Sequence, residues 1–154
     1  MNQVTTRPSH LRWGPLAVVA LGGAVGASAR EAASLLIPNL GALPIAIPVV
    51  NIVGAFLLGY LYEAVTRLGA GDSRAKNLKL LLGTGFCGGF TTYSSMATDT
   101  AVLNSNGHLG LAFSYAIGTV LLGAVATWAG IVIAARANAR RSALARDTTN
   151  TVTQ

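Results

Sequence analysis

The segment from Gly83 to Ser95 places glycines and hydroxyl side chains inside an otherwise apolar stretch. Between Leu80 and Thr98 no residue carries a formal charge, and ten of the 19 residues are Gly, Ser or Thr. A segment of this length can cross a bilayer as a helix, but its glycines disfavour a regular one. Irregular backbone at membrane depth survives only where protein buries it or where it lines a watery cavity. We therefore expect this segment to break in its middle and to handle ions.

Two kinds of ion chemistry are open to such a break. Freed carbonyl groups bind cations, as carbonyl rings do in channel filters. Freed amides and hydroxyls at the start of a half-helix can instead face an anion. The residue types in this segment suit both uses.

A stripe of small and hydroxyl side chains marks the last apolar run. Tyr115, Thr119, Gly123 and Thr127 recur four residues apart and therefore share one face of a helix. A single hydroxyl on a membrane helix usually donates back to its own backbone. The continuity of this stripe favours a polar track through the membrane.

Three other polar side chains stand within the apolar runs or at their ends. The amide of Asn51 needs a partner or water in a membrane, and it serves either as contact between helices or as a donor to a ligand. Arg30, with Glu31 as an available partner, either reaches outward to the interface or draws anions into a vestibule. Asp99 follows the glycine-rich segment. It either belongs to the same vestibule as Arg30 or simply lies in water at the end of a helix.

The elements that must position these residues follow from hydropathy. The chain has 154 residues, of which 52% are hydrophobic and 10% are charged, and its mean hydropathy is +0.54. This composition predicts an all-α membrane protein with four transmembrane helices, the third of them broken. We expect an N-terminal tail over residues 1–12, the membrane domain over 13–136 and a disordered C-terminal tail over 137–154. The four uncharged runs are 13–29, 41–62, 80–98 and 109–135.

The charges are distributed very unevenly. Of the eleven Lys and Arg residues, ten lie in the N-terminal tail, between the second and third runs or after the fourth run. With four spans these three segments share one side, so the positive-inside rule predicts cytoplasmic termini. Because the net charge of +6 flanks the spans, it points to a bilayer rather than to nucleic acid. No nucleophile stands with a base and no carboxylates pair within the runs, which argues against an enzyme.

Three motifs in this order resemble the fluoride channel family known as Fluc or CrcB. They are Gly22-Gly23-xx-Gly26-Ala27-xx-Arg30, Val50-Asn51-xx-Gly54-Ala55-Phe56-xx-Gly59 and Gly85-Phe86-Cys87-Gly88-Gly89-Phe90-Thr91-Thr92-Tyr93-Ser94. The resemblance implies a small protein of the bacterial cell membrane that passively exports fluoride. It also implies an antiparallel dimer that encloses two pores.

The resemblance assigns roles to individual residues. It implies a structural sodium ion at the dimer centre, bound by the backbone carbonyls of Gly88 and Thr91. It places Asn51, Tyr115 and Thr119 along the anion pore. Tyr93 and Met96 stand where the family has two pore phenylalanines, and Asp99 stands where it has glutamate.

The partner of this chain is a separate question. A homodimer that inserts both ways needs little charge bias, and the family includes pairs of paralogous subunits with fixed, opposite orientations. We therefore hypothesise a paralogous partner for this chain. Two alternatives remain: an accessory subunit whose glycines serve only packing, and a proton-coupled exporter. The exporter needs a titratable group at mid-membrane, whereas Asp99 and Glu63 lie at the ends of their runs.

Overall fold

The computed structural model describes residues 13–68 and 72–152, with backbone alone for Arg67 and 144–152. Within these ranges every named element is helical, and the only β-pairing is an isolated bridge between Leu40 and Leu43. Three helices are long and apolar enough to cross a membrane: α1 (Trp13–Leu36), α2 (Ala46–Ala64) and the Leu109–Ala143 part of α6 (Leu109–Val152). The described chain is thus all-helical, as the composition predicts. The predicted N-terminal tail lies outside the described residues.

The glycine-rich segment belongs to a composite rod that follows α2. A short helix, η2 (Val65–Leu68), ends the described part of the chain before the connection to this rod. The rod then runs through α3 (Ser73–Leu78), the π-helix η3 (Lys79–Cys87) and α4 (Gly88–Phe90), and it resumes as α5 (Tyr93–Ser105). Thr91 and Thr92 have extended backbone (φ −84°, ψ 155° and φ −150°, ψ 123°), and they separate α4 from α5.

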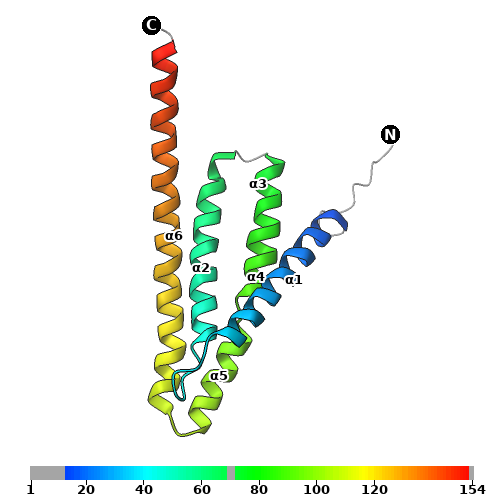
Figure 1. Ribbon diagram of the computed structural model, residues 1–154, viewed down its shortest axis with the longest axis vertical. Helices are drawn as coiled ribbons and strands as arrows, with labels where there is room; N and C mark the ends of the chain where they lie inside the picture. The colour runs from blue at the N-terminus through cyan, green and yellow to red at the C-terminus, as the bar shows by residue number, and fades with distance from the viewer. Residues whose placement is uncertain (1–12, 69–71, 153–154) are drawn as a thin grey trace, which may run out of the picture.

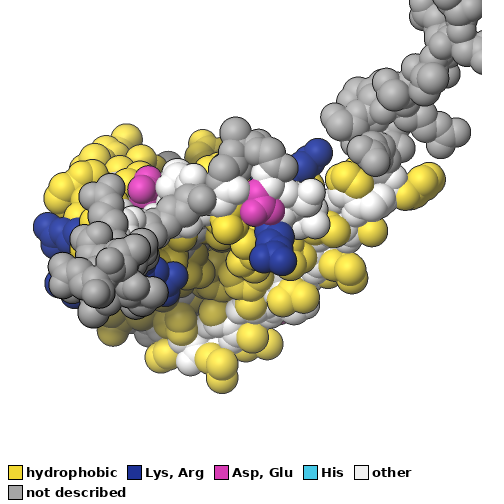
Figure 2. All heavy atoms as spheres, turned by 90° about the horizontal axis from the view of Figure 1, so that it is seen from above, with side chains coloured by type: hydrophobic (Ala, Val, Ile, Leu, Met, Phe, Trp, Pro, Cys, Tyr) yellow, Lys and Arg dark blue, Asp and Glu magenta, His cyan; other side chains and the backbone are white. Residues whose placement is uncertain are grey.

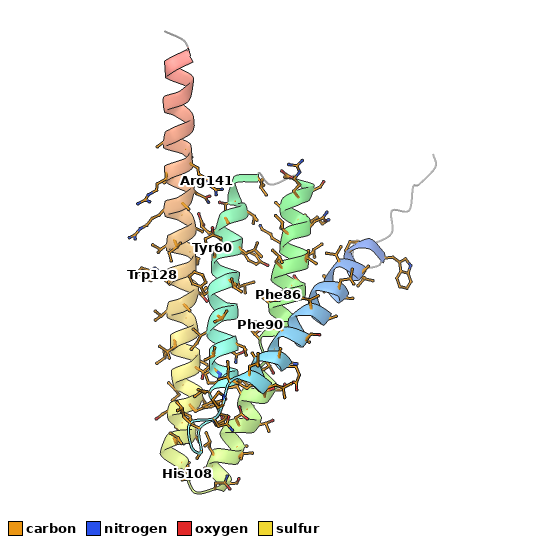
Figure 3. The ribbon with its side chains drawn as sticks, in the orientation of Figure 1. Tyr60, Phe86, Phe90, His108, Trp128 and Arg141 are labelled. Carbon is orange, nitrogen blue, oxygen red and sulfur yellow. The ribbon has the colours of Figure 1, made fainter. Side chains whose placement is uncertain are left out.

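The helices form two main packing groups. α2 packs mainly against α6, whereas α1 crosses η3 and α4 obliquely (Figure 1). The start of α1, η2, the start of α3 and the end of α6 lie at one end of the molecule, which we call the basic end. His108 marks the opposite end and Arg141 lies towards the basic end (Figure 3). The basic segments that the structure describes after α2 and at the end of α6 therefore share one end.

Close approach between backbones fixes α1 on the composite rod. Gly22 and Gly26 are buried, and a Cβ atom added at these positions would collide with the carbonyl oxygens of Leu81 and Phe86. Small residues at this spacing let helices touch backbone to backbone. Phe86 and Phe90, whose stacked rings have centroids 5.4 Å apart, lie on the rod next to α1 (Figure 3). The glycines of α1 thus set the position of the segment that breaks.

The outer surface suits a hydrocarbon environment. Large apolar side chains such as Trp128, which is 67% exposed, cover the outside of the helices. Viewed onto the basic end, the flanks are hydrophobic and Lys and Arg side chains lie at several separate places across this end (Figure 2). Apolar patches of this extent on a soluble monomer would be unusual.

The end of α6 differs from the prediction for the C-terminal tail. We expected disorder from residue 137, whereas α6 continues to Val152. The sequence after Arg136 is rich in Ala and Arg and contains neither Gly nor Pro, so it has high helix propensity. In addition, Asn138 Nδ2 donates to the Glu63 carbonyl over 3.2 Å, which ties the first extra turn to the end of α2.

The packing of α1 gives a matched prediction. Gly26→Ala is expected to destabilise the protein by about 2 kcal/mol, because the added methyl group meets backbone that cannot move aside. Gly14→Ala in the same helix has open space and should leave stability unchanged or raise it by up to about 1 kcal/mol, because alanine has the higher helix propensity. Denaturant unfolding in detergent micelles measures both, and equal stability of the two variants would contradict the packing.

Candidate ion site at the helix break

A reciprocal pair of hydrogen bonds holds the break between α4 and α5. Asn51 Oδ1 accepts from the Thr92 backbone N–H over 2.8 Å, and Asn51 Nδ2 donates to the Thr92 carbonyl over 3.0 Å. The side-chain amide therefore pairs with Thr92 as a neighbouring strand would. Backbone groups left unpaired in a membrane cost several kcal/mol. Asn51 removes that cost for both polar groups of the extended residue.

The break diverts two amides from the carbonyls that an α-helix would give them. In an unbroken helix the Thr92 N–H would donate to the Gly88 carbonyl and the Ser95 N–H to the Thr91 carbonyl. Instead, the Thr92 N–H donates to Asn51, and the Ser95 N–H donates to Thr92 Oγ1 over 3.2 Å. The two carbonyls at which the resemblance implies sodium are thus the two that lose these helical donors.

Thr91 and Gly54 bring the break against α2. Both the backbone N–H and the hydroxyl of Thr91 donate to the Cys87 carbonyl over 2.9 Å. These bonds fix the side chain so that its methyl group lies over Gly54, where an added Cβ would collide with it. The absence of a side chain at Gly54 therefore lets the break reach Asn51, one turn earlier on α2.

Four of the five predicted pore residues line one cavity, which we call the break cavity. It has a volume of about 260 Å³, and its lining includes Asn51, Tyr93, Met96 and Thr119. The two side chains at the phenylalanine positions differ in exposure. Tyr93 is 79% exposed and projects from the chain, whereas Met96 is 7% exposed and packs with the α5–α6 core. Of these two positions, the one at Tyr93 therefore presents a ring to the outside of this subunit.

The fifth residue, Tyr115, lies beside the break cavity in a buried contact between α5 and α6. Its hydroxyl donates to Asp99 Oδ2 over 2.7 Å, so Asp99 takes part in packing between helices as well as closing the segment. Thr119 donates to the Tyr115 carbonyl over 2.6 Å, and Thr127 donates to the Gly123 carbonyl over 3.0 Å. The hydroxyl side chains of this stripe share one face of α6, but each of them already donates its proton to an acceptor within the protein.

These bonds determine which groups offer protons to an anion. A threonine hydroxyl turns about its C–O bond, so Thr119 can exchange its helical acceptor for another. The amide of Asn51 carries two N–H bonds, of which Thr92 uses one. Asn51 can therefore hold the break and still present a donor to the break cavity.

Arg30 stands apart from this group. It is half-buried on α1, and no described carboxylate pairs with it, including that of the exposed Glu31. It does not line the break cavity. The structure thus leaves the Arg30 guanidinium separate from the residues that surround Asn51.

Thr92 is the functional residue that the sequence analysis missed. Besides its two bonds to Asn51, its hydroxyl accepts from the Ser95 N–H and contacts the Ser94 and Ser95 hydroxyls at 3.2 Å. It therefore caps α5 in the way that Ser and Thr cap helices generally. A hydroxyl residue directly before a new helical run was the available signal.

Comparison with known proteins agrees with this architecture. The family model described as CrcB-like protein, Camphor Resistance (CrcB), matches residues 17–131. A protein of Leifsonia xyli named fluoride-specific ion channel FluC 2 is 37% identical over 141 residues, which cover 92% of this chain and 97% of the relative. A Mycobacterium tuberculosis protein named fluoride-specific ion channel FluC 1 is 42% identical over 87% of this chain and 99% of its own. A Deinococcus radiodurans protein named fluoride-specific ion channel FluC is 43% identical over 77% of this chain and 93% of its own length.

The class of protein is therefore an all-helical, multi-pass membrane protein whose relatives are named as channels. The chain belongs to the CrcB family. It is not an enzyme, as the lack of paired catalytic groups in its sequence predicts.

Both backbone polar groups of Thr92 bond to Asn51, so the stability of the protein should depend strongly on the side chain at position 51. Asn51→Ala leaves a backbone donor and a backbone acceptor unpaired and should destabilise the protein by about 2–5 kcal/mol. Asn77→Ala, at an exposed position on α3, is the matched control and should be nearly neutral. Chemical unfolding in micelles measures both, and a neutral Asn51→Ala would show that these bonds do not hold the break.

Proposed function

We propose that the chain is a subunit of a fluoride-selective channel through which fluoride leaves the cytoplasm passively. Membership in the CrcB family and the names of its relatives support this function. The observation that carries it is the break cavity, whose lining brings together Asn51, Thr119 and Tyr93. These residues carry an amide N–H that Thr92 does not use, a hydroxyl and an aromatic ring. Fluoride is small and tightly hydrated, so a selective pore needs several donors at short range.

The topology follows from the composite rod. We take residues 73–105 as a fourth span, which enters from the basic end and reverses at Asn106–His108. The Lys and Arg bias then puts the basic end in the cytoplasm of a bacterial cell, with both termini there. An inside-negative potential expels an anion by about 2.3 kcal/mol per charge per 100 mV, so export needs no other energy source.

We further propose an antiparallel dimer with a pore on each side. An apolar groove of about 390 Å³ between α5 and α6 opens to the outside of the subunit. Tyr93 and Phe113, which are 79% and 60% exposed, line it. A second subunit packed there would bury both rings and could receive Tyr93 at its own break cavity.

A sodium ion fits the centre of this dimer. The carbonyls of Gly88 and Thr91 have lost their helical donors, and Gly88 is exposed. Two subunits, each supplying two such carbonyls, would together offer four oxygens, which is the chemistry that a hard cation prefers. Sodium would hold the two broken helices together and is not transported.

Two features favour a paralogous partner over a second copy. Ten of the eleven basic residues lie on one side, so a single orientation is strongly preferred. Met96 lacks the ring that a pore phenylalanine offers to an anion. A partner inserted in the opposite orientation would supply the aromatic pair that this chain has only in part.

Reconstitution into liposomes tests the function. With its partner subunit, the chain should release fluoride rapidly under an outward gradient and should discriminate against chloride. Fluoride-selective electrode recordings measure the efflux, and protein-free liposomes are the control. Absence of efflux with the partner present would favour the alternative, an accessory subunit that packs but does not conduct.

The chain alone separates the two kinds of dimer. If a paralogue is required, lone chain should give little efflux, and Met96→Phe should increase it by restoring a ring at the break cavity. Robust efflux from the unmodified lone chain would contradict the requirement for a paralogue while leaving the channel function intact.

A further inference from the structure

The contact between α2 and the composite rod leaves cavities unfilled. α2 packs mainly against α6, and η3 packs mainly against α1, which leaves space between α2 and η3. At the basic end this space forms a cavity of about 540 Å³, which we call the entrance groove. Its lining includes Tyr62, Lys76, Lys79 and Thr84.

The entrance groove leads towards the helix break. A second cavity of about 390 Å³ continues between α2 and η3, and it shares Thr84 with the entrance groove. This middle cavity in turn shares Asn51 and Thr91 with the break cavity. Three adjoining cavities thus follow one another from the basic end to the residues proposed to face fluoride.

The charges in the entrance groove favour an anion. No described carboxylate forms an ion pair with Lys76 or Lys79. The Lys79 ammonium lies 5.4 Å from the centre of the Tyr62 ring, which holds it at the wall of the groove. The one acidic residue of the lining, Asp72, uses Oδ1 to accept from the Arg74 backbone N–H over 2.7 Å. Asp72 therefore caps α3, and the two lysines outnumber it.

We propose that the entrance groove is the cytoplasmic capture site for small inorganic anions. Lys76 and Lys79 raise the local anion concentration, and the Thr84 hydroxyl offers the first donor on the way to Asn51. Clefts lined by one sign of charge concentrate ions and raise their encounter rates. This inference rests on the proposed function for its physiological anion, but capture itself does not require conduction.

Basic residues near a membrane also set topology, and that role alone makes a different prediction. A lysine that only sets topology needs to lie at the correct end, and it need not line a cavity. Arg74 is such a residue, since it is exposed on α3 and is absent from the lining of the entrance groove. It provides a matched control for Lys76 and Lys79.

Thiol labelling in membrane vesicles tests the capture site directly. In a Cys87→Ala background, Thr84→Cys introduces the only thiol of the chain. Its reaction rate is measured with a negative reagent, sulfonatoethyl methanethiosulfonate, and with a positive one, trimethylammonioethyl methanethiosulfonate. The ratio of the negative to the positive rate reports the potential in the groove and cancels differences in access.

The proposal predicts that Lys76→Gln combined with Lys79→Gln lowers this ratio roughly tenfold at low salt. The effect should shrink at 1 M salt, where the Debye length falls to about 3 Å and the lysine charges are screened. Arg74→Gln should change the ratio less than twofold. The proposal is overturned if the double lysine variant matches Arg74→Gln, or if neither reagent modifies the thiol in the native protein. Because labelling does not depend on fluoride efflux, failure here is distinct from failure of the channel function.

Discussion

Every feature of the site depends on how the polar backbone at Thr92 is satisfied. A break in a membrane helix exposes amide and carbonyl groups that lipid cannot pair. Asn51 supplies both partners from another helix, at 2.8 and 3.0 Å. Because the Thr92 N–H is drawn to α2, the Gly88 carbonyl loses its usual donor. One side chain therefore stabilises the break and also creates the oxygen ligand that the proposed sodium site needs.

The surrounding packing serves this contact. Gly54 admits the Thr91 methyl group, and so the break can approach α2 closely enough for Asn51 to reach Thr92. On the other side, Gly26 lets α1 press directly on the rod just before the break. Since the rod is held from both sides, α5 begins at a defined position and brings Tyr93 and Met96 to the break cavity. Glycines on α1 and α2 thus fix the position of the break and of the two α5 residues that follow it.

Much of the fold could be predicted from the sequence, because hydropathy and charge are properties of whole segments. The uncharged runs around α1, α2 and α6 indicated apolar helices, and the family motifs gave the membership that comparison shows. The helical continuation of α6 past residue 137 was not expected, since polar composition suggested disorder where local helix propensity was high. The Ala and Arg residues between 137 and 146 favour a helix, although the Thr and Asn residues after them are poor helix formers.

The candidate site was harder to predict, because its chemistry depends on contacts between distant residues. Asn51 and Thr92 are 41 residues apart, and nothing in either motif shows that one pairs with the other. The hydroxyl stripe was visible as a spacing, and Thr119 and Thr127 donate within α6 itself, to the Tyr115 and Gly123 carbonyls. By contrast, the bond from Tyr115 to Asp99 depends on the packing of α5 against α6. Lys76 and Lys79 stood in the sequence only as topology signals. Their place in a groove follows from the loose contact between α2 and η3.

The central claim is that Asn51 creates a cation site by diverting the Thr92 N–H. Thermal unfolding of the chain together with its partner subunit in detergent, in sodium and in N-methylglucamine buffers of equal ionic strength, tests it most directly. A ligand that binds the folded state stabilises it by mass action, so sodium should raise the unfolding midpoint of the wild-type protein. That increment should disappear in Asn51→Ala and persist in Asn77→Ala. An equal sodium increment in all three proteins, or none in the wild type, would contradict the account.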